Sequence, residues 1–170
     1  MSSSSHFDLR LIYASDLEEA LQDQQTINFA AIVDALDDGS MATLKLSAGD
    51  NYIPGPFFNA GGIRSVFRDG DVLNDAYNGL FGLSGAGSYD SLREQPGVVD
   101  MSIMNMIGFD ASVVGNHEFD AGPSAFEDLV AADARGDAGP AGDRYVGALF
   151  PYLSSNLDFS GESGLQDLYT

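Results

Sequence analysis

The stretch Ile107-Gly-Phe-Asp-Ala-Ser-Val-Val-Gly-Asn-His-Glu-Phe-Asp-Ala-Gly122 decides the fold, because it passes from a buried strand into a polar loop. Small and β-branched residues such as Val113 and Val114 suit the interior of a sheet. Gly115 allows the backbone to turn, and the next five residues are almost all potential ligands or proton carriers. Pro123 then suits the first turn of a helix. A polar loop between a strand and a helix is where open α/β sheets place their sites.

Two earlier strands are predicted to end in the same way. Residues 9–14 form a predicted buried strand that leads into Asp16 and Glu18, whose spacing points both carboxylates to one side in extended backbone. Taken alone, this acidic end is explained equally well by an exposed turn. A second strand, residues 41–47, leads into Asp50 after a glycine. Three successive polar strand ends together favour a site for Zn²⁺, Mn²⁺, Fe or Mg²⁺, which accept oxygen and imidazole ligands.

The rest of the chain predicts helices between these strands. An apolar period over residues 26–36 indicates an amphipathic helix with Phe29, Ile32, Val33 and Leu36 on its buried face. The alternation of strands and helices predicts an α/β fold with a mostly parallel sheet flanked by helices, so the carboxyl ends of the strands share one edge. Further elements are predicted as a buried helix at 98–107, a helix at 124–132, a strand at 152–156, and an insertion or long excursion with some helix at 60–97.

Composition narrows the class of partner. The 170 residues carry 26 acidic and 7 basic side chains, a formal net charge of −19. Such a surface repels nucleic acid and anionic membranes, whose recognition needs basic patches, and it is compatible with cation binding. The sequence has no cysteine, which excludes disulfides and thiolate metal sites. It shows no apolar run long enough to span a membrane and no signal peptide.

The polar segments resemble the sequence blocks of one enzyme family. Gly115-Asn116-His117-Glu118 resembles the Gly-Asn-His-Glu box of the calcineurin-like metallophosphoesterases, and the Phe119-Asp120 that follows resembles their 5′-nucleotidase branch. Asp16-Leu17-Glu18 and Gly49-Asp50 resemble the two preceding blocks, Asp-x-His and Gly-Asp. Phe150-Pro-Tyr-Leu-Ser-Ser-Asn156 resembles the next strand of that branch, so the resemblance covers most of the chain.

The resemblance implies a site for two divalent cations on one half of an αββα sandwich. The cations would be Zn²⁺, Mn²⁺, Fe, Mg²⁺ or Ca²⁺. Asp16 and Glu18 would bind one cation, Asp50 would bridge both, and Asn116 would bind the second. Metals about 3.5–4 Å apart activate water and neutralise phosphate oxygens.

The resemblance also implies a reaction and a substrate. The activity would be hydrolysis of small phosphate monoesters, nucleotides above all, in a periplasmic or extracellular location. His117 would face the scissile phosphate and stabilise charge or protonate the leaving group. Asp120 would orient His117 or pair with its charge.

Two departures from the family pattern matter. Position 18 is Glu where the family usually has His, which favours Mn²⁺, Mg²⁺ or Ca²⁺. The family also supplies further histidines downstream, whereas this sequence has only His6 and His117. We therefore expect residues 1–170 to be an incomplete N-terminal part of the catalytic domain, inactive alone and prone to self-association through an uncovered sheet face. The alternative is a non-catalytic cation-binding or structural remnant of the same fold.

Overall fold

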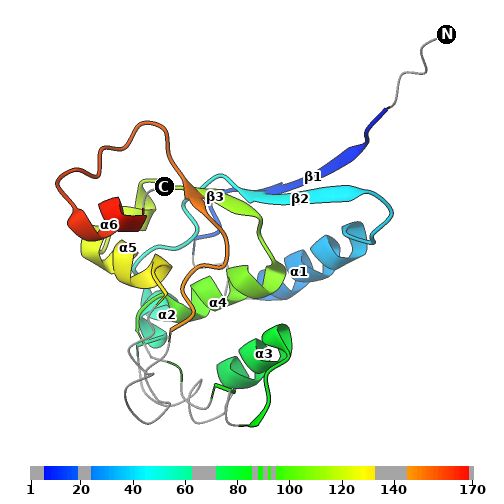
Figure 1. The fold of residues 1–170 in the computed structure, drawn as a ribbon, viewed down its shortest axis with the longest axis horizontal. Coiled ribbons are helices and arrows are strands. Elements are labelled where there is room, and N and C mark those ends of the chain that lie inside the picture. The colour runs from blue at the N-terminus through cyan, green and yellow to red at the C-terminus, as the bar shows by residue number, and fades with distance from the viewer. Residues whose placement is uncertain are drawn as a thin grey trace.

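The computed structural model describes residues 6–18, 24–62, 72–85, 88–89, 92, 95–132 and 145–168. Its centre is a four-stranded sheet in which every neighbouring pair of strands is parallel, in the order β1-β2-β3-β4 (Figure 1). The strands are β1 (Leu9–Ala14), β2 (Ala42–Ser47), β3 (Ala111–Val113) and β4 (Tyr152–Leu153). The predicted α/β fold with a parallel sheet is therefore confirmed, and all four carboxyl ends lie at one edge.

Helices connect the strands in the predicted alternation. They are α1 (Gln24–Leu36) between β1 and β2, then α2 (Pro56–Ala60), α3 (Val72–Phe81) and α4 (Val98–Ile107) before β3, then η3 (His117–Phe119) and α5 (Pro123–Val130) before β4, and finally α6 (Ser163–Leu168). Among the residues that the structure describes, no helix has the length and apolarity needed to cross a membrane.

The core lies between the sheet and the helices, with α4 at its centre. Met101 and Met104 of this helix are fully buried, which confirms the predicted buried helix and its bounds. Methionine fills irregular gaps between elements well. Phe126 of α5 packs edge-on against both Phe119 and Tyr152, so it ties the segment after β3 to β4.

The buried face of α1 differs from its prediction. Val33 is buried, and Phe29 and Ala30 pack against the core, but Ile32 and Leu36 are exposed. The helix begins at Gln24, and its buried stripe is centred on Val33 and Ala30 instead of running through all four predicted apolar residues. Periodicity identifies a helix, whereas its rotation about its own axis depends on the sheet beneath it.

The fourth strand is shorter than predicted. It ends at Leu153 because Ser154 begins a turn, in which its hydroxyl oxygen accepts hydrogen bonds from the backbone N–H groups of Asn156 (3.4 Å) and Leu157 (3.3 Å). Serine and asparagine side chains compete in this way with the backbone pairing of a strand.

Among the residues that the structure describes, no helix covers one face of the sheet. Helices α1 to α4 lie together on the opposite side of the sheet (Figure 1). On the open face, strand alternation and register place Leu11 beside Leu44 and Val113 beside Leu153, and all four side chains are exposed. We call Leu9, Leu11, Tyr13, Leu44, Val113 and Leu153 the open sheet face. Such a face is expected of one half of a two-sheet sandwich.

The segment 60–97, predicted as an insertion or excursion with some helix, contains α3. Parts of this segment, residues 63–71, 86–87, 90–91 and 93–94, lie outside the described residues. Tyr77 of α3 is buried, and its hydroxyl donates to Ser102 Oγ (3.0 Å) and accepts from Asn105 Nδ2 (2.9 Å). The predicted helix is confirmed, and the assignment as an insertion stays a prediction.

Candidate metal site

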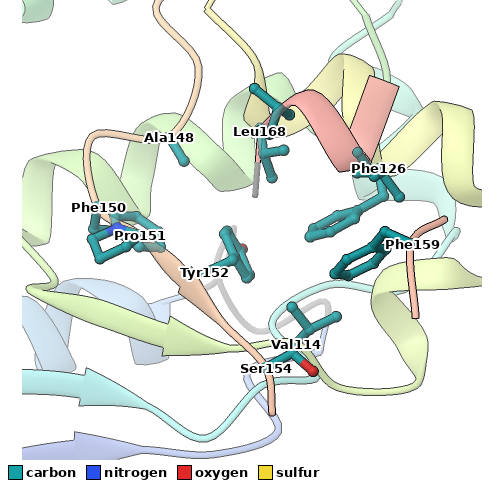
Figure 2. A pocket seen from close by; sticks show the side chains of 11 residues that line it. Val114, Phe126, Ala148, Phe150, Pro151, Tyr152, Ser154, Phe159 and Leu168 are labelled. Carbon is teal, nitrogen blue, oxygen red and sulfur yellow. The ribbon is translucent and has the colours of Figure 1, made fainter. Parts of the chain in front are cut away.

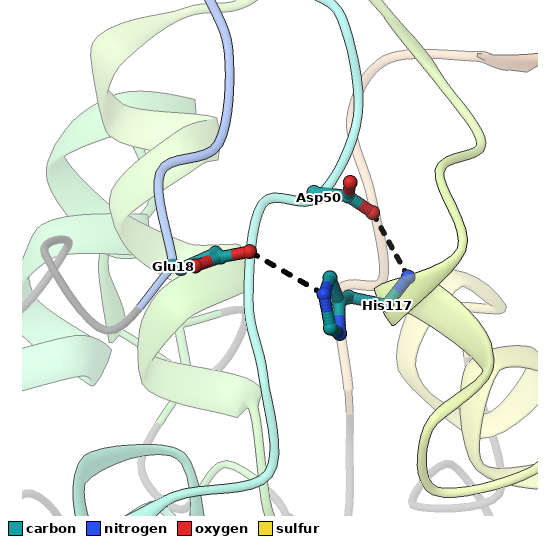
Figure 3. Close-up of side chains that lie close together, drawn as sticks. All are labelled: Glu18, Asp50 and His117. Carbon is teal, nitrogen blue, oxygen red and sulfur yellow. Dashed lines mark hydrogen bonds and ion pairs between the residues drawn. The ribbon is translucent and has the colours of Figure 1, made fainter.

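Three strand ends bring two carboxylates and one imidazole together. Glu18 follows β1, Asp50 follows β2, and His117 begins η3 after β3 (Figure 3). One ligand atom from each residue lies within 4.8 Å of the others. Carboxylate oxygen and imidazole nitrogen are donors that divalent cations such as Mn²⁺ and Zn²⁺ accept, so these residues fit a cation of that class.

His117 is the centre of this group. Its Nε2 lies 3.5 Å from Glu18 Oε1, and its backbone N–H donates to Asp50 Oδ1 at 2.9 Å (Figure 3). On the other side of the ring, Nδ1 lies 2.6 Å from Asp120 Oδ2. The hydrogen bond with Asp120 raises the pKa of the His117 imidazole above its ordinary value, and the nearby Asp50 and Glu18 carboxylates act in the same direction.

The other two predicted ligands lie beside this group. Asp16 is exposed, accepts a hydrogen bond from the Ser15 hydroxyl, and is not one of the three converging residues. Asn116 is exposed and precedes η3 without a capping hydrogen bond from its side chain. The pattern of polar strand ends placed His117 at the same edge as these acidic residues, but the family resemblance gave it a catalytic role and not that of a ligand.

Two of the predicted ligands have unusual backbone conformations. Asp16 has φ 54° and Asp50 has φ 52°, in the left-handed region that residues other than glycine seldom occupy. Aspartate tolerates this region better than most residues. Such conformations cost about 1–3 kcal/mol and cluster at ligand-binding sites, which supports a functional role for both loops.

The loops after β2 and β3 approach so closely that each needs a glycine. Gly49 has φ +94°, and a Cβ there would lie 2.8 Å from the backbone nitrogen of Gly115. A Cβ on Gly115 would lie 2.3 Å from Asp50 Oδ1 and 2.7 Å from Glu118 Oε2. Side chains at these positions would therefore push apart the loops that carry Asp50 and His117.

Glu118 joins the same two loops through buried hydrogen bonds. Its side chain is buried, with 2% exposure, and accepts hydrogen bonds from the backbone N–H groups of Gly115 (2.7 Å), Asp50 (3.1 Å) and Asn51 (3.0 Å) and from Asn51 Nδ2 (2.9 Å). The sequence placed Glu118 among potential ligands or proton carriers without assigning it a role. The local feature of the sequence that could have indicated this role is the three-residue spacing between Gly115 and Glu118, which lets the Glu118 carboxylate reach the backbone N–H of Gly115.

Asn51 extends this network into the sheet. It is fully buried, its Oδ1 accepts from the Ser47 hydroxyl, and its Nδ2 donates to Ser112 Oγ at 2.9 Å. Ser47 closes β2 and Ser112 lies in β3. Sequence reasoning missed all three residues, because buried serine and asparagine carry no motif of their own.

An apolar pocket lies beside the polar edge. It has a volume of about 190 Å³ and lies between β4, α5 and α6, with Phe126 and Phe159 on one side and Tyr152 on the other (Figure 2). No carboxylate, imidazole or amine is among the described residues that line it. Its chemistry differs from that of the strand ends, so the cation-binding residues lie elsewhere.

Comparison with known proteins gives a partial match to a nucleotide phosphoesterase. No family model matches the sequence. A stretch of 71 residues is 39% identical to the "Trifunctional nucleotide phosphoesterase protein YfkN" of Bacillus subtilis (strain 168). This stretch is 41% of the present chain and only 5% of that much longer protein. Together with the geometry of the strand ends, the match supports a phosphoesterase relationship for this chain in general terms.

Proposed function

We propose that this chain is the N-terminal, cation-binding part of a phosphoesterase of the 5′-nucleotidase type, which hydrolyses phosphate monoesters of nucleotides. The observation that carries the proposal is the convergence of Glu18, Asp50 and His117 from three separate strand ends to within 4.8 Å. The partial match to a nucleotide phosphoesterase supports the substrate class. A periplasmic or extracellular location belongs to the proposal and rests on the family resemblance.

In this proposal Asp16, Glu18, Asp50 and Asn116 hold two divalent cations. The chemistry that such cations supply is neutralisation of phosphate oxygens and activation of water. Asp50 lies between the first and third strand ends, which suits a bridging ligand. Because Glu18 is anionic where imidazole is usual, we propose Mn²⁺, Mg²⁺ or Ca²⁺ ahead of Zn²⁺ or Fe.

His117 and Asp120 are the proposed catalytic pair. The Asp120 carboxylate holds a proton on Nδ1 and keeps the ring orientation fixed. Because the pKa of His117 is raised, a larger fraction of the ring is protonated near neutral pH. A protonated Nε2 can donate to a phosphate oxygen or to the leaving alkoxide, a contribution worth roughly 10²–10⁴-fold in rate.

The proposal includes low activity for these 170 residues alone, because the sequence contains only two histidines. The same observation favours a second candidate, a cation-binding module that retains the fold without catalysis. Hydrolysis of AMP, followed by phosphate release with Mn²⁺ present, separates the two in a longer form of the parent protein that includes its downstream residues. Chelator-sensitive turnover there supports the enzyme, and its absence supports the second candidate.

The variant His117→Ala tests the proposed division of labour in that longer form. We expect turnover to fall by roughly 10²–10⁴-fold while Mn²⁺ binding is retained, because a catalytic group is lost and the carboxylate ligands remain. Metal content measured beside turnover decides the matter. If His117→Ala lost its Mn²⁺, His117 would be a ligand and the proposed catalytic role would be wrong.

We also propose that two copies of this chain associate through the open sheet face. This face carries no charged side chain, so in a protein of net charge −19 it can meet its copy without bringing carboxylates together. Sedimentation of Leu11→Thr tests this, with Ile32→Thr on α1 as a control of nearly equal exposure (55% and 56%). We expect only Leu11→Thr to weaken association, and a wild-type monomer at high concentration would reject the proposal.

A further inference from the structure

We infer that Glu118 is a positioning residue that fixes the loop after β2 against the loop after β3, and that it thereby sets the affinity of the site for a divalent cation. That a cation binds here depends on the proposed function, whereas the hydrogen bonds of Glu118 are observed in the structure. The carboxylate touches neither substrate nor cation in this assignment and acts through Asp50 and His117.

Both oxygens of Glu118 are fully used in joining the two loops. Oε2 accepts from the backbone N–H groups of Gly115, in its own loop, and of Asp50, which is 68 residues away in sequence. Oε1 accepts from the backbone N–H and the side-chain amide of Asn51. A buried carboxylate that accepts several N–H hydrogen bonds is well satisfied, although it gives up its contact with water.

These bonds act directly on the proposed ligand Asp50 and, through it, on the proposed catalytic residue His117. Glu118 holds the backbone of Asp50, and Asp50 Oδ1 in turn accepts the backbone N–H of His117, the neighbour of Glu118 in the chain. These two hydrogen bonds and the peptide bond between His117 and Glu118 form a closed ring that joins the loops after β2 and β3. Partners that orient the residues of a metal site typically change its metal affinity 10–100-fold when they are mutated.

The chemistry of the contacts requires a carboxylate of this length. A glutamine at position 118 would keep one acceptor oxygen, but its NH₂ group would face two N–H donors, either those of Gly115 and Asp50 or those of the Asn51 backbone and side chain. Glutamine would therefore lose either the two hydrogen bonds from Asp50 and Gly115 or the two hydrogen bonds from Asn51. An aspartate would keep both acceptors and shorten the reach by one methylene, so Glu118→Asp should retain part of the effect.

The test is a Mn²⁺ titration of the 170-residue chain, followed by electron paramagnetic resonance of free Mn²⁺. We expect Glu118→Gln to bind Mn²⁺ roughly 10–100-fold more weakly than wild type, and Glu118→Asp to lie between them. Thermal unfolding of each variant is measured in the absence of cation. Asn105→Ala is the matched control, because Asn105 is a buried amide that bonds Tyr77, Gly147 and Leu149 far from the strand ends.

Each outcome has a defined meaning. A large loss of Mn²⁺ affinity in Glu118→Gln, with affinity retained in an equally destabilised Asn105→Ala, supports the inference. Equal affinity in Glu118→Gln and wild type overturns it and leaves the proposed function standing. An equal loss in Asn105→Ala also overturns it, since general destabilisation would then explain the effect. If wild type binds no Mn²⁺, the proposed function fails first and the inference fails with it. If Glu118→Gln does not fold, Glu118→Asp decides by the same comparison.

Discussion

The loops after β2 and β3 are held to each other by buried hydrogen bonds, whereas the loop after β1 contacts the loop after β2 through two long hydrogen bonds. Glu118 and Asn51 are both almost fully buried between the first two loops. By contrast, the backbone N–H groups of Asp16 and Glu18 reach Gly49 and Asp50 carbonyl oxygens at 3.3 and 3.4 Å. We call the first pair of loops the clamped side of the site and the loop after β1 its loose side.

This difference indicates which part of the site is preorganised. On the clamped side, folding places Asp50 and His117 before any cation arrives, so little ordering remains to be done on binding. On the loose side, the backbone N–H of Glu18 makes a long hydrogen bond of 3.4 Å to the Asp50 carbonyl oxygen, so we expect Glu18 to adjust to the cation. We therefore expect the clamped side to determine whether a cation binds and the loose side to determine which cation is preferred.

The largest effect is expected for Asp50→Ala. This change removes the proposed bridging carboxylate together with the acceptor of the His117 N–H, so we expect no saturable Mn²⁺ binding by isothermal titration calorimetry. Asp37→Ala is the control for the loss of one negative charge. Asp37 lies away from the site, where its carboxylate pairs with Lys45 Nζ at a distance of 3.0 Å. Binding by Asp50→Ala with an affinity near that of wild type would contradict the central place of this residue.

A backbone change on the clamped side comes next. Gly115→Ala places a Cβ 2.3 Å from Asp50 Oδ1, and we expect a loss of about 1–3 kcal/mol in the free energy of unfolding together with weaker Mn²⁺ binding. The control is Gly79→Ala in α3, where a Cβ would meet nothing within 4 Å and should stabilise the helix by roughly 0.5–1 kcal/mol. Urea unfolding measures both, and a neutral Gly115→Ala would show that the loops are not held in close contact.

The sequence predicted which residues lie at the strand ends, but it did not predict the hydrogen bonds that hold the clamped side together. Apolar runs that end in glycine and polar residues predicted the strands, and β1 and α4 have the predicted bounds. The polar ends also predicted that Glu18, Asp50 and His117 would meet. The role of Glu118 was not predictable, because it depends on partners 67 and 68 residues away that only the pairing of β2 with β3 brings close. Local patterns carry no information about such a contact.

Two errors in the predicted elements, in α1 and in β4, have different causes. The apolar period located the helix, but Ile32 and Leu36 are exposed because the sheet covers only the stripe through Val33 and Ala30. In β4, the polar residues after Leu153 were counted as strand, although Ser154 turns the chain with its own hydroxyl. The error in α1 therefore concerns how the helix meets the sheet, which tertiary packing decides, whereas the error in β4 concerns a local turn made by a serine side chain.

A smaller effect is expected on the loose side. Glu18→His should keep Mn²⁺ binding within about tenfold, because Asp50 and the clamped loops are unchanged, and should shift the preference toward Zn²⁺, which imidazole suits better. Competition between Zn²⁺ and Mn²⁺ for the 170-residue chain measures this shift. If Glu18→His abolished binding as completely as Asp50→Ala, the distinction between the two sides would be wrong.

The smallest expected effect is a change in the titration of His117. The hydrogen bond to Asp120 is the largest cause of the raised pKa of this imidazole, so Asp120→Asn should lower the pKa in the absence of cation. Glu18→Gln should lower the pKa of His117 less, because Glu18 contributes the weaker of these interactions.

The raised pKa of His117 also makes stability depend on pH. A folded-state pKa above the unfolded value means that the pair of His117 and Asp120 stabilises the fold fully below the unfolded pKa, and that this stabilisation is lost as pH rises through the folded pKa. Nuclear magnetic resonance follows the imidazole of His117, whose signal is identified by its loss in His117→Ala. An unchanged or higher pKa in Asp120→Asn would show that Asp120 does not hold the His117 proton, and the proposed catalytic pair would lose its second member.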